Sequence, residues 1–184
     1  MNNRDSLMKN IFSVTCTQKI MEYLAQFPGR QFVAGEIQNR VKISKGGVNQ
    51  SLRELAKEGF VNREKKSKIF LYSINHTKAV VKQFKILKNI ELLRSLTDKI
   101  SEISDRIVLF GSSARGEDSF DSDLDIFILT KHADQVNSIL KKYRLSRKLQ
   151  TIVRVPVDYA NMERKEPVFF EEINRGVVIW ENKE

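Results

Sequence analysis

Two aspartates and a glycine–serine pair are the residues of this sequence best suited to chemistry. Asp123 and Asp125 lie two residues apart at the start of an apolar run that predicts a strand, so both carboxylates leave the same face. Paired carboxylates are hard oxygen ligands of the kind that Mg²⁺ takes. Gly111-Ser112 follows an earlier apolar run, where a turn into a helix would offer backbone N–H groups and a hydroxyl to a phosphate. Together these groups predict a metal-bound triphosphate and in-line phosphoryl or nucleotidyl transfer.

The same residues resemble the polymerase-β-type nucleotidyltransferase superfamily in its smallest form. That family has Gly-Ser, a glycine four residues after the serine, and Ser-Asp-x-Asp, and the resemblance extends over residues 105–182. It implies that an NTP is the substrate and that Asp123 and Asp125 hold Mg²⁺, two ions if the site is catalytic. The nucleotide-binding residues that it implies are Gly111, Ser112, Arg115, Gly116 and Ser122.

A third catalytic carboxylate is expected on the next strand, because the family uses one there to orient the nucleophile. The run Leu149–Val155 predicts that strand and contains no acid, so the nearest candidate is Asp158. If the strand runs through Val157, Asp158 can point toward the aspartate pair. If Pro156 ends the strand, Asp158 faces solvent and the site is incomplete. The other acids nearby are interpreted as solvated or capping: Glu117, Asp118 and Asp121.

The elements that must position these groups alternate between strand and helix over residues 105–184. This alternation predicts a small α/β domain with a mixed sheet. The predicted strands are Arg106–Phe110, Leu124–Leu129, Leu149–Val155 and Val177–Trp180, and the predicted helices are Asp134–Tyr143 and Pro167–Asn174.

Residues 77–104 predict a helix that connects this domain to the preceding one. Apolar residues recur in it every three or four positions from Val80 to Ile103. Such a stripe could form the seam of a homodimer, or it could pack on its own domain, and we favour the second interpretation.

Residues 1–76 predict a winged helix-turn-helix. Thr15–Phe27 and Ala34–Val41 have helical spacing, Ser44 is a candidate N-cap for a third helix over Lys45–Glu58, and two strand-like runs follow. In the winged-helix family, which this order resembles, the third helix enters the major groove of duplex DNA and the hairpin touches the backbone.

The candidate DNA-binding residues follow from this arrangement. With the apolar side chains of the third helix turned inward, its polar residues face outward and can pair with base edges, and the lysines of the hairpin can neutralise phosphates. These residues are Lys45, Asn49, Gln50, Arg53, Lys65, Lys66 and Lys68. The alternative is a winged helix that contacts protein and has a solvated basic face.

The uneven distribution of charge along the chain supports a division into two halves with different functions. Residues 1–100 hold 19 Lys and Arg against 8 Asp and Glu, whereas residues 101–184 hold 13 against 15. The first half is therefore expected to meet a polyanion. A single cysteine, no apolar run of membrane-spanning length and no apparent signal peptide predict a cytoplasmic protein that does not contact a membrane.

The fold class predicted is α+β, with an N-terminal winged helix-turn-helix and a small C-terminal α/β nucleotidyltransferase domain. Two functions stay open. The chain could be a DNA-binding enzyme that transfers a nucleoside monophosphate to an acceptor hydroxyl, and the resemblance includes antitoxins that modify a protein partner. Alternatively it is a transcriptional regulator whose second domain binds a nucleotide or a partner without turnover.

Overall fold

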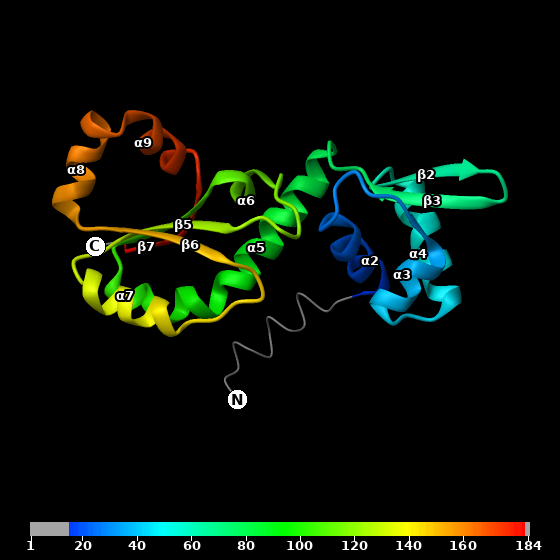
Figure 1. Ribbon diagram of the computed structural model, residues 1–184, viewed down its shortest axis with the longest axis horizontal. Helices are drawn as coiled ribbons and strands as arrows, with labels where there is room; N and C mark the ends of the chain where they lie inside the picture. Colours follow the sequence, from blue (N-terminus) through cyan, green and yellow to red (C-terminus); the bar gives the residue numbers. More distant parts are fainter. Residues whose placement is uncertain (1–14, 183–184) are drawn as a thin grey trace. The chain divides into compact units, whose positions relative to one another are not determined.

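The computed structural model describes residues 15–182, and the chain divides into two compact units after Lys78 (Figure 1). The first 14 residues of the expected domain 1–76 and the last two of the expected domain 105–184 lie outside the described residues. Within the described part, no helix combines the length and the apolar composition that a membrane crossing needs.

The first unit has the element order of a winged helix-turn-helix, as predicted. Strand β3 pairs antiparallel with both other strands, giving the order β1-β3-β2. Helices α3 and α4 form the helix-turn-helix, and β2 with β3 forms the wing. The elements are α2 (Cys16–Ala25), β1 (Phe32–Val33), α3 (Ala34–Val41), α4 (Lys45–Lys57), β2 (Val61–Lys66) and β3 (Ile69–Ile74).

The turn between α3 and α4 forms because the sequence caps both helices. Lys42 ends α3 with a left-handed φ of 53°. Ser44 begins α4, and its hydroxyl accepts a hydrogen bond from the backbone N–H of Gly47 at 3.2 Å. Val48 and Leu52 on one side of α4 are buried, so the opposite side of the helix faces outward.

The wing is a hairpin with a two-residue turn at its tip. Lys66 and Ile69 are the last paired residues of β2 and β3, and Ser67 between them has a left-handed φ of 56°. Strand β2 continues through Lys66, so Lys65 and Lys66 lie in β2 and Lys68 lies in the turn.

The second unit contains a four-stranded mixed sheet of order β6-β5-β4-β7, in which only β5 and β6 are parallel. Its strands are β4 (Arg106–Phe110), β5 (Leu124–Leu129), β6 (Leu149–Arg154) and β7 (Val177–Glu181). Its helices are α5 (Ala79–Ile100), the 3₁₀ turn η1 (Ser101–Ile103), α6 (Gly111–Arg115), α7 (Ala133–Lys142), α8 (Pro156–Lys165) and α9 (Pro167–Asn174).

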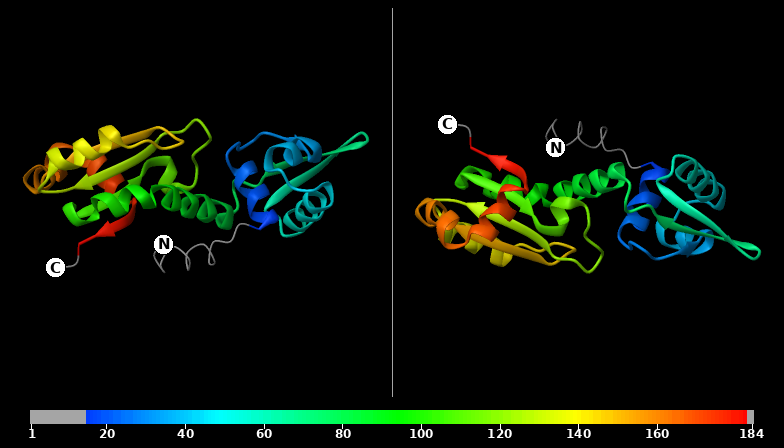
Figure 2. Two further views of the ribbon diagram at one scale, coloured as in Figure 1. Left: turned by 90° about the horizontal axis from the view of Figure 1, so that it is seen from below. Right: turned by 90° about the horizontal axis from the view of Figure 1, so that it is seen from above.

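Helices cover both faces of this sheet (Figure 1 and Figure 2). Ile126 and Ile128 of β5 pack with residues of α5 and α7 on one face. Phe127 points the other way and packs with Met162 of α8 and Ile173 of α9. The alternation along β5 therefore places Asp125, which is two residues before Phe127, on the face that α8 and α9 cover.

Two expectations about this unit need correction. Residues 79–100 form α5, whose buried Leu93, Leu96 and Ile100 belong to the core of the second unit, so most of the expected connecting segment 77–104 is part of that unit. Helix α8 was not expected at all. Pro156 does not merely end the preceding strand. It occupies the first turn of a helix, where its missing N–H costs nothing.

Candidate active site and nucleic-acid interface

The turn after β4 depends on a glycine. Gly111 has a φ of 66°, in the left-handed region, and leads directly from β4 into α6. A Cβ atom built on it would lie 2.6 Å from Oδ2 of Asp125, closer than real Cβ atoms come to other atoms. Only glycine therefore combines this backbone conformation with so close an approach of the carboxylate. The glycine–serine turn and Asp125 are neighbours in the structure.

Asp123 and Asp125 stand at the N-terminal end of β5. Asp125 is in register with Phe110, the last residue of β4, and Asp123 precedes β5 by one residue. Both side chains are half-buried. The structure thus places Asp125 beside the turn at Gly111, with Asp123 two residues before it.

The charges around the pair are unbalanced. Burial raises the pKa of Asp125, and the nearby carboxylates of Asp123 and Glu172 raise it further. Asp123 has a cationic partner, because Nζ of Lys148 donates to its Oδ2 at 2.7 Å. This hydrogen bond and the negative charge of Asp123 raise the pKa of the Lys148 ammonium group.

This arrangement fits Mg²⁺. The ion is commonly held in proteins by one or two carboxylates, and water and substrate phosphates supply its other ligands. In the described part of the chain no three His, Cys, Asp or Glu side chains gather as a metal-binding group. Asp123 and Asp125 would therefore share the ion with the phosphates of a nucleotide. A cation there would relieve the electrostatic cost of ionising Asp125.

Arg147 holds the loop that leads into β5. Its guanidinium donates to the carbonyl of Ser122 at 2.8 and 3.1 Å, and to that of Asp123 at 3.4 Å. The hydroxyl of Ser113 donates to the same Asp123 carbonyl at 3.1 Å. The Ser122 hydroxyl accepts from the backbone N–H of Ser119 at 2.8 Å, so in this structure it stabilises the loop. Arg147 and Ser113 together fix the main chain at Asp123.

Asp118 corrects one interpretation made from the sequence. It is not solvated, because only 4% of its surface is exposed. Its Oδ2 accepts from Arg147 at 2.7 Å, and its Oδ1 lies 3.4 Å from Nζ of Lys85 on α5. Arg147 also donates to Asn89 of α5 at 2.9 Å. A buried carboxylate with two cationic partners fastens the loop to α5.

Arg115 and Gly116 complete α6. Gly116 has a φ of 66°, and a Cβ there would collide with the backbone of Lys82, so this glycine lets α6 pack closely on α5. Nε of Arg115 donates to Glu117 at 3.0 Å, and its Nη1 lies 3.8 Å from Glu172. The Arg115 side chain is 55% exposed, so it is accessible to a phosphate on this side of the domain.

The outward side of α4 carries the polar residues predicted to contact DNA. Lys45, Gln50 and Arg53 are exposed and Asn49 is half-buried. Gln50 donates to Glu54 at 3.0 Å, which orients its amide along the helix surface. The exposed residues Lys45, Gln50 and Arg53 therefore give α4 an accessible polar face.

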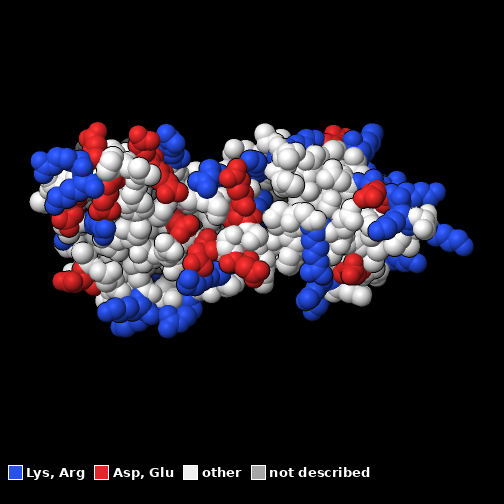
Figure 3. Space-filling model, turned by 45° about the horizontal axis from the view of Figure 1, so that its top comes forward, with Lys and Arg blue, Asp and Glu red and all other residues white. Residues whose placement is uncertain are grey.

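The wing adds a basic edge. Lys65, Lys66 and Lys68 are all exposed, and Figure 3 shows Lys and Arg side chains gathered at the end of the unit that carries the hairpin. Arg63 of β2 lies over the ring of Phe70 with 3.7 Å between Cζ and the ring centroid, which stiffens the base of the wing.

The comparisons with known proteins decide the family of the second unit. The family described as "Polymerase beta, Nucleotidyltransferase" matches residues 91–184, about half of the chain and only its C-terminal part. The chain belongs to this nucleotidyltransferase family. No match is found among the curated proteins.

Several solved structures of regulators and chromatin proteins also align with the chain. A predicted DNA-binding transcriptional regulator from E. coli shares 23% identity, covers 47% of this chain and 88% of its own, and has a TM-score of 0.35. A mutant of Lactococcus lactis ZitR in complex with DNA shares 15%, covering 56% and 84%, with a TM-score of 0.38. TrmBL2, an archaeal chromatin protein, shares 14%, covering 89% and 74%, with a TM-score of 0.34. Such low scores establish no shared fold by themselves.

Asp158 lies away from the aspartate pair. This residue lies exposed in the first turn of α8, after the C-terminal end of β6. Strands β5 and β6 are parallel, and Asp125 pairs with Gln150 near their N-terminal ends. Asp158 is therefore beyond the opposite end of the sheet from the aspartate pair, and it cannot supply the third carboxylate.

Gln150 occupies the place where a third carboxylate on the adjacent strand would stand. It is the register partner of Asp125, and its amide carries no charge. Besides Asp123, the acid that raises the pKa of Asp125 is Glu172 of α9, which sequence reasoning missed. No spacing signal pointed to it, because Glu172 lies 47 residues after Asp125 and reaches the site only through the packing of α9 on β4 and β5.

Proposed function

We propose that the second unit is a Mg²⁺-dependent nucleotidyltransferase. The observation that carries the proposal is the close approach of Asp125 to Gly111, with Asp123 two residues before it, in a chain of this family. Mg²⁺ bound there would neutralise charge on the triphosphate and on the attacking oxygen.

The residues of the chain then have separate tasks. Asp123 and Asp125 hold the metal-bound NTP, and the hydroxyl and backbone of Ser112 receive a phosphate oxygen. Arg115 is exposed on the same side and can pair with the phosphates. An acceptor hydroxyl attacks the α-phosphorus, its O–P bond forms as the bond to pyrophosphate breaks, and the hydroxyl proton passes to solvent or a carboxylate.

Label transfer tests this proposal. The full chain is incubated with Mg²⁺ and each labelled NTP in turn, and label is sought on protein and on nucleic acid. We expect Asp123→Asn and Asp125→Asn to abolish transfer, because each removes one of the two anionic ligands. Asp158→Asn is the matched control and should change nothing. Transfer that survives both substitutions in β5, or that is lost with Asp158→Asn, would place the chemistry elsewhere.

A second candidate function is nucleotide sensing without turnover. The observation that favours it is Gln150, a neutral residue where a third carboxylate would stand. Triphosphate binding needs only two carboxylates, whereas activating the acceptor hydroxyl benefits from a third. Mg²⁺-dependent NTP binding without label transfer to any acceptor would favour this candidate.

We also propose that the first unit binds duplex DNA. Its support is the winged helix-turn-helix with a polar outer face on α4 and a basic wing, in a unit that holds 14 Lys and Arg against 6 Asp and Glu over residues 1–78.

Affinity for duplex DNA should fall steeply with salt. Arg53→Ala should cost about 1–3 kcal/mol at one base position, whereas Lys66→Ala should weaken all sequences alike. Salt-insensitive binding would contradict the proposal.

A further inference from the structure

Strand β7 forms one edge of the four-stranded sheet in the second unit, and Figure 2 shows it at the margin of that unit. It pairs with β4 on one side, and no strand within residues 15–182 pairs with it on the other. The backbone N–H and C=O groups of such an edge are a template for pairing with a further strand. Proteins therefore usually protect an edge strand with charged side chains, proline or a covering element.

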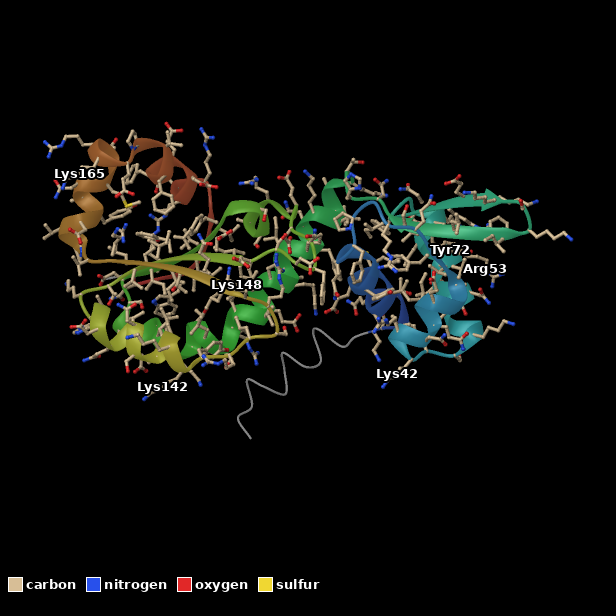
Figure 4. The ribbon with its side chains drawn as sticks, viewed as in Figure 1. Lys42, Arg53, Tyr72, Lys142, Lys148 and Lys165 are labelled. Atoms are coloured by element: carbon tan, nitrogen blue, oxygen red, sulfur yellow. The ribbon has the colours of Figure 1, made fainter. Side chains whose placement is uncertain are left out.

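The two edges of this sheet differ in their side chains. The opposite edge, β6, contains Gln150 and Arg154, and Lys148, labelled in Figure 4, directly precedes it. Strand β7 has the sequence Val-Val-Ile-Trp-Glu. The charged side chain in it is Glu181, whose Oε1 lies 3.2 Å from Nε of Arg106 in the same chain. The register irregularity against β4 adds twist to β7 but no charge to its outer edge, so this edge is apolar and weakly protected.

Val178 and Trp180 give this edge an exposed apolar surface. Their neighbours Val177 and Ile179 pack against the core that α5 covers, so Val178 and Trp180 lie on the other face of the sheet. There they are 40% and 38% exposed. The indole N–H of Trp180 donates to the carbonyl of Ser104 at 3.3 Å, which orients the ring and leaves part of its surface open to a further contact.

A second copy of the same strand complements this edge. Antiparallel pairing about a two-fold axis at Ile179 would include all five residues of β7. Val178 of each copy would then lie opposite Trp180 of the other, and an aromatic residue opposite a β-branched one stabilises antiparallel strands. Glu181 would lie opposite Val177, so the two glutamates stand at opposite ends of the pairing and do not repel each other. The surface is therefore self-complementary, as a two-fold interface requires.

We propose that two copies of the chain associate through the outer edges of their β7 strands, which joins their two four-stranded sheets into one. The association buries Val178 and Trp180 of both copies and pairs the backbone groups at the free edge. An interface of one short strand from each chain is small, so the dimer forms reversibly at micromolar concentrations. It holds two winged-helix units together, so with the DNA binding proposed above one dimer contacts DNA with two units.

Sedimentation equilibrium of the full chain tests this association. We expect the average mass to rise from one chain toward two as the protein concentration is raised. Val178→Glu and Trp180→Lys should each raise the dissociation constant by at least about tenfold, because each removes both cross-strand pairs and adds a charge at the edge. In an equimolar mixture of these variants the introduced carboxylate and ammonium groups lie opposite each other, so a dimer with one chain of each kind should form. This rescue depends on the register about Ile179.

The matched control is Val168→Glu, which makes the same change at an exposed residue of α9. It should leave the dissociation constant unchanged, and thermal unfolding checks that every variant is folded. Wild-type chain that stays single at all concentrations, or a mixture without rescue, would overturn the proposal. Association that survives Val178→Glu but is lost with Leu87→Glu would assign the contact to the exposed side of α5 and also overturn it.

Amide hydrogen exchange of the wild-type chain gives a second measurement that needs no substitution. Exchange within residues 177–181 should slow as the dimer forms, because amides at the outer edge gain hydrogen-bond acceptors. Unchanged exchange in β7 at concentrations where the mass is that of two chains would show that the copies associate through another surface.

Discussion

The carboxylate of Asp125 is held in a position that is unfavourable for a free ion. It is partly desolvated and faces the charges of Asp123 and Glu172, while the ammonium group of Lys148 contacts Asp123 instead. Ligand sites often keep such uncompensated charge, because the bound ion supplies the missing interaction. The cost of this arrangement should be measurable in the stability of the second unit.

Asp125→Asn should therefore stabilise the metal-free second unit at neutral pH. The folded pKa of Asp125 is raised above its ordinary value of 3.8, so folding loses stability as the pH rises from 3.8 through the raised pKa. The neutral amide lacks this penalty, and we expect a melting temperature a few degrees higher in EDTA. The difference should vanish below pH 3.8, where both states of wild type are protonated.

The control for this measurement is Asp123→Asn. It removes the partner of Lys148 and should not raise the melting temperature. A variant Asp125→Asn that melts at or below the wild-type temperature at neutral pH would show that its carboxylate is already compensated.

We expect Lys148 to weaken the binding of Mg²⁺ alone and to strengthen the binding of Mg²⁺-NTP. Its ammonium group occupies Oδ2 of Asp123 when no metal is bound, so it competes with Mg²⁺, and once displaced it can pair with the triphosphate. Lys148→Gln should bind Mg²⁺ alone severalfold more tightly and bind Mg²⁺-NTP about tenfold more weakly, because one charge-assisted hydrogen bond to the phosphates is missing. Calorimetry measures both, with Lys165→Gln as control. If Lys148→Gln changed both affinities in the same direction, the movement of Lys148 from Asp123 to the triphosphate would be excluded.

At the residue scale, the sequence could predict the groups that lie in one continuous motif. The motif groups Gly111, Ser112, Asp123 and Asp125, and the pairing of β4 with β5 places Gly111 and Asp125 side by side. Lys148 was missed because only the parallel register of β5 and β6 places it beside Asp123. Asp118 was misjudged because one of its partners, Lys85, precedes it by 33 residues on α5.

Among the elements, the first turn of α4 contains two glycines, Gly46 and Gly47, whose surroundings differ. A Cβ on Gly46 would meet no atom within 4 Å, whereas one on Gly47 would lie 2.9 Å from Cγ2 of Ile43. Glycine is a poor helix former, so Gly46 weakens the helix without any packing reason within the described residues. The absence of a side chain at Gly46 would let a DNA phosphate come close to the start of α4.

Gly46→Ala should therefore raise stability and lower DNA affinity. We expect about 0.5–1 kcal/mol of stabilisation of the first unit by denaturant titration, because alanine restricts the unfolded chain and favours the helix. Binding to duplex DNA should weaken severalfold, because the added methyl group meets the phosphate. Gly47→Ala, which crowds Ile43, should destabilise the unit. Undiminished DNA binding by Gly46→Ala would mean that no phosphate comes close there.

Element prediction succeeded where periodicity and caps agreed, and it failed at a proline. The expected bounds of Ala34–Val41, Arg106–Phe110 and Leu124–Leu129 are those of α3, β4 and β5. Pro156 was interpreted as a strand residue or a strand end, although proline in the first turn is also typical of a helix start. Asp158 lies in the first turn of that helix, at the opposite end of the sheet from the aspartate pair.

On the scale of the whole molecule, each unit has its own buried core and its own charge. The first unit buries Ile20, Leu24 and Leu52, and the second buries Leu93, Leu109 and Ile126. The strongly basic composition belongs to the first unit alone, since residues 79–184 are nearly neutral. Substitutions far apart and without shared partners are usually additive, so the two proposed activities should be separable.

Lys66→Ala should weaken DNA binding and leave Mg²⁺-NTP binding unchanged, and Asp125→Asn should do the reverse. In the double variant the two effects should add within about 0.5 kcal/mol. Anisotropy with duplex DNA and calorimetry with NTP measure them on the same preparations. A deviation from additivity larger than about 0.5 kcal/mol, of either sign, would show that ligand binding to one unit changes the affinity of the other.

The close approach of Asp125 to Gly111 has a consequence for how this sequence can diverge. The carboxylate fills the space that a side chain at position 111 would need, and the backbone there is left-handed. A descendant with a smaller residue in place of Asp125 would have space for a side chain at position 111, but the backbone there would still be left-handed. Asparagine, which tolerates a positive φ, could then replace the glycine. An asparagine at 111 paired with a small residue at 125 would mark a lineage that keeps the fold without the proposed nucleotide transfer.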